Sequence, residues 1–149
     1  MADCAATTIL IRHADVPENG GTDPHLSEAG VARAEALAEL LRDTTIGAII
    51  GTNTHRSRET AGPVSQAAHI APEFVELDRN DIPANVAAVL AKLDNLPEAT
   101  TALVIGHTVT VPRFIAGLGG PTDLVIPEGD FDHLFVLAGG CLTHLRYPG

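Results

Sequence analysis

Basic and histidine side chains follow three apolar runs of the chain, at the points where these runs end. They are Arg12 and His13 after the first run, Arg56 after the second and its polar loop, and His107 after a later run. Short β-branched runs of this kind are typical of buried strands. Ligands bind at the carboxyl ends of parallel strands, so we expect these side chains to meet. Two imidazoles and two guanidiniums together suit a small, doubly charged anion such as a phosphate.

Each of these residues has a more ordinary explanation when taken alone. A single histidine after a strand usually hydrogen-bonds a loop, and an arginine at a strand end is usually solvated or ion-paired. Arg56 and Arg58, however, stand near the start of an expected helix, where the helix dipole favours acidic residues. Binding an anion there explains this unfavourable placement. The joint occurrence therefore predicts an anion site more strongly than any one residue does.

The elements that position these side chains alternate along the chain. We expect helices that begin after Ser27 and end near Asp43, run from Arg56 to about His69, and cover Pro83–Leu93 and Thr108–Leu118. We expect strands over Thr7–Arg12, Ile46–Ile50, Phe74–Leu77, Thr101–Ile105, Leu124–Ile126, His133–Leu137 and Leu142–Arg146. This alternation predicts an α/β fold with a mostly parallel sheet, and Gly139–Gly140 predicts an antiparallel hairpin at one edge.

Length and composition exclude several classes of protein. The 149 residues fit one domain, residues 1–149, and the net charge of −10 argues against binding to nucleic acid or to an anionic membrane surface. No apolar run approaches the roughly 18 residues of a membrane-spanning helix, and no signal peptide is evident, so we expect a cytoplasmic protein. Cys4 and Cys141 have no metal-ligand spacing, and we expect reduced thiols.

Four motifs carry a family resemblance, and they occur in a fixed order. They are ILIRHAD (Ile9–Asp15), DPHLSEAG (Asp23–Gly30), RSRETA (Arg56–Ala61) and VIGHT (Val104–Thr108). Together they resemble the histidine phosphatase superfamily, which includes the cofactor-dependent phosphoglycerate mutases and small bacterial phosphatases. The resemblance implies a phosphoglycerate mutase-like, three-layer α/β/α sandwich. It also implies an enzyme that needs neither a metal nor another cofactor.

The resemblance implies roles for the residues that match the motifs. His13 is expected to attack phosphorus and to form a phosphohistidine, while Arg12 and Arg56 bind the phosphoryl oxygens. His107 is expected to donate a further hydrogen bond, and the helix expected from Thr108 would point free N–H groups at the same anion. The family usually has serine at the start of the second motif. Here His55 precedes Arg56 and is a further candidate for substrate contact.

The proton donor for the leaving group is not fixed by the motifs. In the family it is often a glutamate in a Leu-x-Glu setting, and the corresponding stretch here reads ELDRND. The candidates are Asp78, Asp81, Glu76 and Asp15, of which we favour Asp78 because it should end its strand. Asp15 and Asp81 are also candidates for substrate contact.

These inferences predict a metal-independent phosphomonoesterase that acts on a small phosphorylated metabolite or a phosphoprotein. Three alternatives remain open. They are a phosphohistidine protein phosphatase, a phosphoglycerate mutase-type phosphotransferase and a binding module that holds phospho-ligands without turnover. His25, His69 and His144 are expected on the surface, whereas His133 could help to close the site. The physiological substrate, the oligomeric state and export as a longer precursor stay open.

Overall fold

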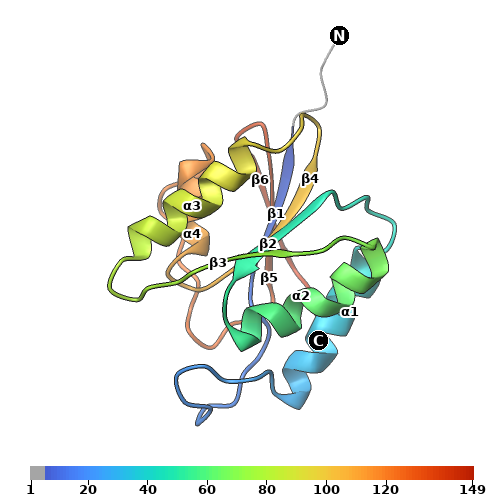
Figure 1. The fold of residues 1–149 in the computed structure, drawn as a ribbon, viewed down its shortest axis with the longest axis vertical. Helices are drawn as coiled ribbons and strands as arrows, with labels where there is room; N and C mark the ends of the chain where they lie inside the picture. Colours follow the sequence, from blue (N-terminus) through green and yellow to red (C-terminus); the bar gives the residue numbers. More distant parts are fainter. Residues whose placement is uncertain (1–5) are drawn as a thin grey trace.

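Six strands form one sheet at the centre of the molecule (Figure 1). The computed structural model describes residues 6–149. Its strands are β1 (Thr7–Arg12), β2 (Ala48–Thr52), β3 (Glu73–Val75), β4 (Thr101–Gly106), β5 (His133–Ala138) and β6 (Cys141–Arg146), and its helices are α1 (Glu28–Leu40), α2 (His55–Ala68), α3 (Ile82–Asp94) and α4 (Val111–Gly117). Among the residues described, no helix has both the length and the apolar character needed to cross a membrane.

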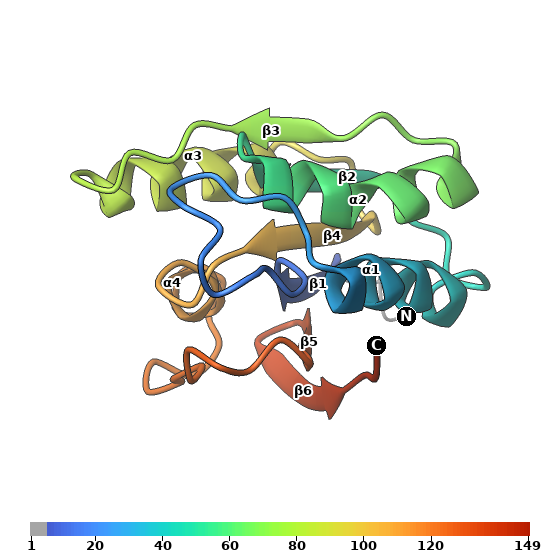
Figure 2. The same ribbon diagram turned by 90° about the horizontal axis from the view of Figure 1, so that it is seen from below.

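The strands lie in the order β3-β2-β4-β1-β5-β6, which can be followed across Figure 2. The first four are mutually parallel, whereas β5 pairs antiparallel with β1, and β6 pairs antiparallel with β5. Gly139 and Gly140 form the β5–β6 turn with φ of 57° and 81°. Two successive positive φ values are what a tight hairpin turn needs, and glycine adopts them without strain. The sheet is therefore mostly parallel with an antiparallel edge, as predicted.

Helices cover both faces of this sheet and complete three layers (Figure 1). Alternate residues of β1 point to opposite faces: Ile9 and Ile11 join the core beneath α1 and α2, and Leu10 joins the core beneath α3 and α4. This alternation follows from the two-residue period of a strand, and burial on both faces explains why the central strands are apolar throughout. The predicted α/β/α sandwich is confirmed.

Several element boundaries differ from the predictions. β2 lies two residues later than expected, α1 ends at Leu40, and α4 begins at Val111 instead of Thr108. The strand predicted at Leu124–Ile126 is wrong. Ile126 is buried against the core beneath α3 and α4, but it reaches that core from a loop without a strand partner. Cys141 is exposed at the start of β6, and Cys4 lies outside the described residues.

Candidate active site

Parallel pairing of β1 and β4 brings two of the candidate histidines together. The register sets Arg12 opposite Gly106, and the N–H of His13 donates to the carbonyl oxygen of Gly106 at 2.9 Å. His13 and His107 thus leave neighbouring strands at the same edge, with ring centroids 5.1 Å apart. They are only 4% and 6% exposed. A Cβ on Gly106 would lie 2.8 Å from the Thr110 hydroxyl, so glycine is needed where the chain leaves β4.

The His13 ring is fixed in one tautomer by its own loop. Nδ1 lies 2.8 Å from the carbonyl oxygen of Ala14, and a carbonyl can only accept, so Nδ1 carries the proton. In the neutral ring Nε2 then holds a lone pair. Burial lowers the pKa of His13 to about 3; the Ala14 hydrogen bond opposes this shift, and the charges of Arg12 and Arg56 add to it. The ring is therefore neutral near pH 7, with a lone pair on Nε2.

His107 is held from two directions. Its ring Nε2 lies 3.1 Å from Oγ1 of Thr52, the last residue of β2, and its backbone N–H donates to Oγ1 of Thr110 at 2.8 Å. Burial lowers the pKa of His107 to about 2, with further contributions from His13 and Arg56. The Thr52 hydroxyl can donate to Nε2 of the neutral ring. Nδ1 is then protonated and can donate to a ligand.

The RSRETA segment lies in the first turns of α2 and is hydrogen-bonded to the loop after His13. Thr54 caps this helix by accepting from the N–H of Ser57. One turn on from Arg56, Thr60 Oγ1 accepts from the N–H of Ala14 at 2.9 Å and donates to the carbonyl oxygen of Arg56 at 2.7 Å. The threonine of the motif thus ties the arginine and histidine segments together.

Both arginines keep a buried guanidinium nitrogen that has no hydrogen-bond partner within residues 6–149. Only 8% of the Arg56 side chain is exposed, and its buried NH1 makes no hydrogen bond with the described residues; this NH1 lies 3.7 Å from Oδ1 of Asp23. NH1 of Arg12 donates to the carbonyl oxygens of Glu128 (2.6 Å) and Asp130 (2.9 Å), while its buried Nε has no hydrogen-bond partner in the part of the chain that the structure describes. Burial lowers the pKa of both arginines, yet guanidinium remains charged in proteins. Buried, unpaired donors of this kind call for an anionic ligand.

These groups line a cavity of about 510 Å³ at the carboxyl ends of β1 and β4. Five of the predicted site residues lie in its wall: Arg12, His13, Arg56, His107 and Thr108. The rest of the wall combines apolar residues with one further cation and two carboxylates, namely Val16, Pro17, Glu18, Gly21, Pro24, Leu77, Arg79, Ile82, Val109 and Glu128. The cavity can therefore hold a phosphoryl group at its base and a partly apolar group at its mouth.

The predicted acids and His55 do not line this cavity. Asp78 accepts from the N–H of Asn80 and closes a turn, Asp81 caps α3, and Glu76 accepts from Asn53. Asp15 forms an ion pair of 2.6 Å with Arg33, which ties the loop after His13 to α1. His55 is exposed and hydrogen-bonds the carbonyl oxygen of Asp23. The favoured Asp78 thus makes a local backbone contact instead of facing the histidines.

Sequence reasoning missed the two carboxylates that do line the cavity. Glu18 belongs to the loop after β1, and it makes no hydrogen bond or ion pair with the described residues. Glu128 accepts from the Thr108 hydroxyl and lies 3.7 Å from NH2 of Arg12. Proximity to His13 along the chain could have singled out Glu18. Glu128 lies in a long loop that no strand end marks, so tertiary structure alone brings it here.

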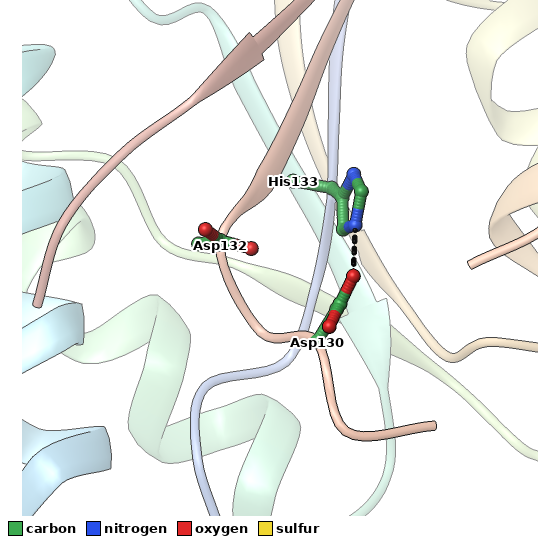
Figure 3. A group of neighbouring side chains, drawn as sticks. All are labelled: Asp130, Asp132 and His133. Atoms are coloured by element: carbon green, nitrogen blue, oxygen red, sulfur yellow. Dashed lines mark hydrogen bonds and ion pairs between the residues drawn. The ribbon is translucent and has the colours of Figure 1, made fainter. Parts of the chain in front are cut away.

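Two other features of the fold resemble ligand sites. Asp130, Asp132 and His133 offer ligand atoms within 4.8 Å of one another (Figure 3), but His133 donates to Asp130, and Arg146 lies 3.0 Å from Asp132. These groups are thus already paired and do not form a convincing metal centre. A larger hollow of about 800 Å³ lies at the opposite end of β1 and β4. Of the described residues that line it, the charged ones are Asp94 and Glu98, which do not suit an anion.

Comparisons with known proteins agree with this geometry. The model of the histidine phosphatase superfamily (branch 1) matches residues 8–83, about half of the chain. No curated protein sequence matches. Similar solved structures include a putative phosphohistidine phosphatase SixA from Nakamurella multipartitia, with 21% identity, 96% of each chain covered and a TM-score of 0.66. A putative alpha-ribazole-5'-P phosphatase from Escherichia coli has 16% identity, 97% coverage of each chain and a TM-score of 0.71.

Proposed function

The chain belongs to the histidine phosphatase superfamily, a membership that supports phosphatase activity, and we propose that it hydrolyses phosphate monoesters through a phosphohistidine on His13. The observation that carries this proposal is the pairing of His13 Nδ1 with the carbonyl oxygen of Ala14, in a cavity with two partly unpaired arginines. A neutral imidazole with a directed lone pair is a competent nucleophile for phosphorus.

In the first step Nε2 of His13 attacks phosphorus and the bond from phosphorus to the leaving oxygen breaks. Charge on the phosphoryl oxygens in the transition state is met by the free edge of Arg12, by Arg56 and by Nδ1–H of His107. In the second step water attacks the phosphohistidine and passes a proton to the carboxylate that protonated the leaving oxygen. The phosphorus–nitrogen bond breaks and returns the lone pair to Nε2, and phosphate leaves. The arginines provide the positive charge that both steps need, so we propose no metal.

We assign the proton for the leaving oxygen to Glu18. Asp78 stays outside the cavity, and the other lining carboxylate, Glu128, is held by Thr108 and Arg12. Glu18 is exposed at the mouth, where a leaving group would lie. The Glu18 carboxyl group makes no hydrogen bond or ion pair with the described residues, so no contact holds it against a leaving oxygen. We therefore expect slow turnover of esters whose leaving group needs a proton.

The slow turnover expected for such esters favours a second candidate substrate, a phosphohistidine in another protein. A protonated imidazole leaves from phosphorus as a neutral group and needs no proton from the enzyme. The SixA structure that resembles this chain is described as a putative phosphohistidine phosphatase. The cavity is also open enough at Pro17, Glu18 and Gly21, which are all exposed, for a side chain of another protein to enter.

Hydrolysis of p-nitrophenyl phosphate in the presence of EDTA tests the proposal. We expect turnover in the wild type and its loss in His13→Ala, with His69→Asn as the matched control. His69 is an exposed histidine at the end of α2 with φ of 56°, a conformation that asparagine tolerates. Retained turnover in His13→Ala would refute the role of His13, and turnover abolished by EDTA but restored by a metal ion would refute the metal-free mechanism.

A further inference from the structure

The loop from Glu128 to Phe131 holds Arg12 on two sides. The carbonyl oxygens of Glu128 and Asp130 accept both hydrogen bonds of NH1. The Phe131 ring packs against the guanidinium, with its centroid 3.9 Å from Cζ. With NH1 occupied and Nε buried, NH2 is the nitrogen of Arg12 that remains for a phosphoryl group. The position of this loop thus decides which edge of Arg12 faces the cavity.

A buried histidine outside the cavity anchors that loop. His133 opens β5, is 4% exposed, and its Nε2 donates to Oδ2 of Asp130 at 2.8 Å (Figure 3). This hydrogen bond holds the pKa of the Asp130 carboxyl below its usual range. His133 Nδ1 lies 2.7 Å from Nε2 of His144 on the paired strand β6.

We propose that Asp130 and His133 are positioning residues for Arg12: their side-chain hydrogen bond fixes the loop whose backbone carbonyls aim the guanidinium at the phosphoryl group. The inference rests on the proposed phosphatase function. Neither side chain touches the cavity, and both act through the main chain of the loop. The antiparallel edge of the sheet thereby contributes to a site built on the parallel strands.

Substitution of Asp130 can separate two roles of this residue, because its backbone carbonyl binds Arg12 and its side chain binds His133. Arg12 is bound by the carbonyl oxygen of Asp130, so a substitution at this residue keeps the contacting atom and changes only its support. Asp130→Ala removes the acceptor for His133. Asp130→Asn keeps an oxygen acceptor at the same place and should restore function. His144→Phe is the matched control, because it removes the outer histidine of the chain, at an exposed position, and leaves the bond between His133 and Asp130 intact.

The test measures kcat and KM for p-nitrophenyl phosphate and the dissociation constant of tungstate, a tetrahedral oxyanion, for all four proteins. In Asp130→Ala we expect kcat to fall about tenfold to a hundredfold while KM changes little. The reason is that a displaced Arg12 guanidinium loses more binding energy in the transition state than in the substrate complex. Tungstate should bind more weakly by a similar factor. Asp130→Asn and His144→Phe should resemble the wild type, and a normal melting temperature should show that each variant is folded.

Each outcome separates this inference from the proposed function. An active wild type with an equally active Asp130→Ala would overturn the anchoring role and leave the phosphatase proposal standing. Equal losses in Asp130→Ala and Asp130→Asn would also overturn it, because charge and not anchoring would then be responsible. If the wild type does not hydrolyse phosphate esters, the proposed function fails. Tungstate affinity still decides the anchoring: weaker binding in Asp130→Ala alone supports it, and equal binding in all four proteins refutes it.

Discussion

The carbonyl oxygen of Ala14 accepts a hydrogen bond from Nδ1 of His13 at 2.8 Å, so a single backbone group one residue away sets the tautomer of the proposed nucleophile. Residue Ala14 is in turn held in place because its backbone N–H donates a hydrogen bond to Oγ1 of Thr60. A chain of two hydrogen bonds therefore runs from α2 to the ring. The orientation of Nε2 toward phosphorus depends on elements that are far apart in the sequence.

The same burial that keeps the two histidines neutral should make stability depend on pH. The pKa values of His13 and His107 are lowered to about 3 and about 2 in the folded chain, whereas an unfolded histidine titrates near 6.5. Below about pH 6.5 both histidines therefore bind protons in the unfolded chain but stay neutral in the folded chain. The free energy of unfolding should fall as pH decreases from about 6.5 toward 4, by up to about 1.4 kcal/mol per pH unit for each ring.

Urea unfolding of His107→Gln across this pH range checks that expectation. The variant should show a shallower loss of stability with falling pH, because one of the two titrating rings is gone. His69→Asn, which replaces an exposed histidine, should keep the slope of the wild type. An unchanged slope in His107→Gln would mean that the folded ring accepts a proton.

The buried charge of Arg56 should lower the free energy of unfolding in the absence of a ligand. Its side chain is 8% exposed, its NH1 has no hydrogen-bond partner among the described residues, and Oδ1 of Asp23 is 3.7 Å from NH1. We expect Arg56→Met to raise the melting temperature without phosphate, because a buried and poorly paired charge is lost. Added phosphate should raise the melting temperature of the wild type but not that of the variant, and kcat of the variant should fall at least about a hundredfold. A phosphate-induced rise of equal size in both proteins would contradict the assigned role of Arg56.

Two glycines should respond in opposite directions to alanine. A Cβ on Gly30 would lie 2.1 Å from the carbonyl oxygen of Asp15, in the loop after His13. Gly30→Ala should therefore destabilise the fold by roughly 1–3 kcal/mol and lower activity. Gly62, within α2, has no atom within 4 Å of such a Cβ, so Gly62→Ala should stabilise by roughly 0.5–1 kcal/mol with activity unchanged. Thermal unfolding and p-nitrophenyl phosphate turnover measure both, and a neutral Gly30→Ala would show that the loop can move away.

The leaving group should control the rate strongly. Because Glu18 is exposed, we expect little help with proton transfer. Phosphoramidate and a phosphohistidine peptide should be hydrolysed at least about a hundredfold faster than an alkyl phosphate such as glycerol phosphate. Glu18→Gln should slow the alkyl ester more than the nitrophenyl ester. Equal rates for all leaving groups would point to an efficient general acid that the cavity, as described, does not reveal.

Sequence patterns predicted the sheet and the base of the cavity because both depend on local signals. Buried strands are apolar runs, and the residues that follow them must meet at one edge when the strands are parallel. The extra strand at Leu124–Ile126 was predicted because a short apolar run looks the same whether it pairs with a strand or packs from a loop. The carboxylates were harder to place. Asp78 follows its strand closely, but its side chain accepts a hydrogen bond from the N–H of Asn80. Glu128 instead reaches the cavity from a loop that is distant in the sequence.

The covalent intermediate is the central claim, and its capture is the most direct test. Wild-type protein is mixed with p-nitrophenyl phosphate, quenched rapidly in alkali, and analysed by peptide mass spectrometry alongside His13→Ala. We predict one added phosphoryl group, stable in alkali and lost in acid, on the peptide that contains His13, and none in the variant. A wild type that turns over without any phosphorylated peptide, or with the group on another residue, would contradict the account.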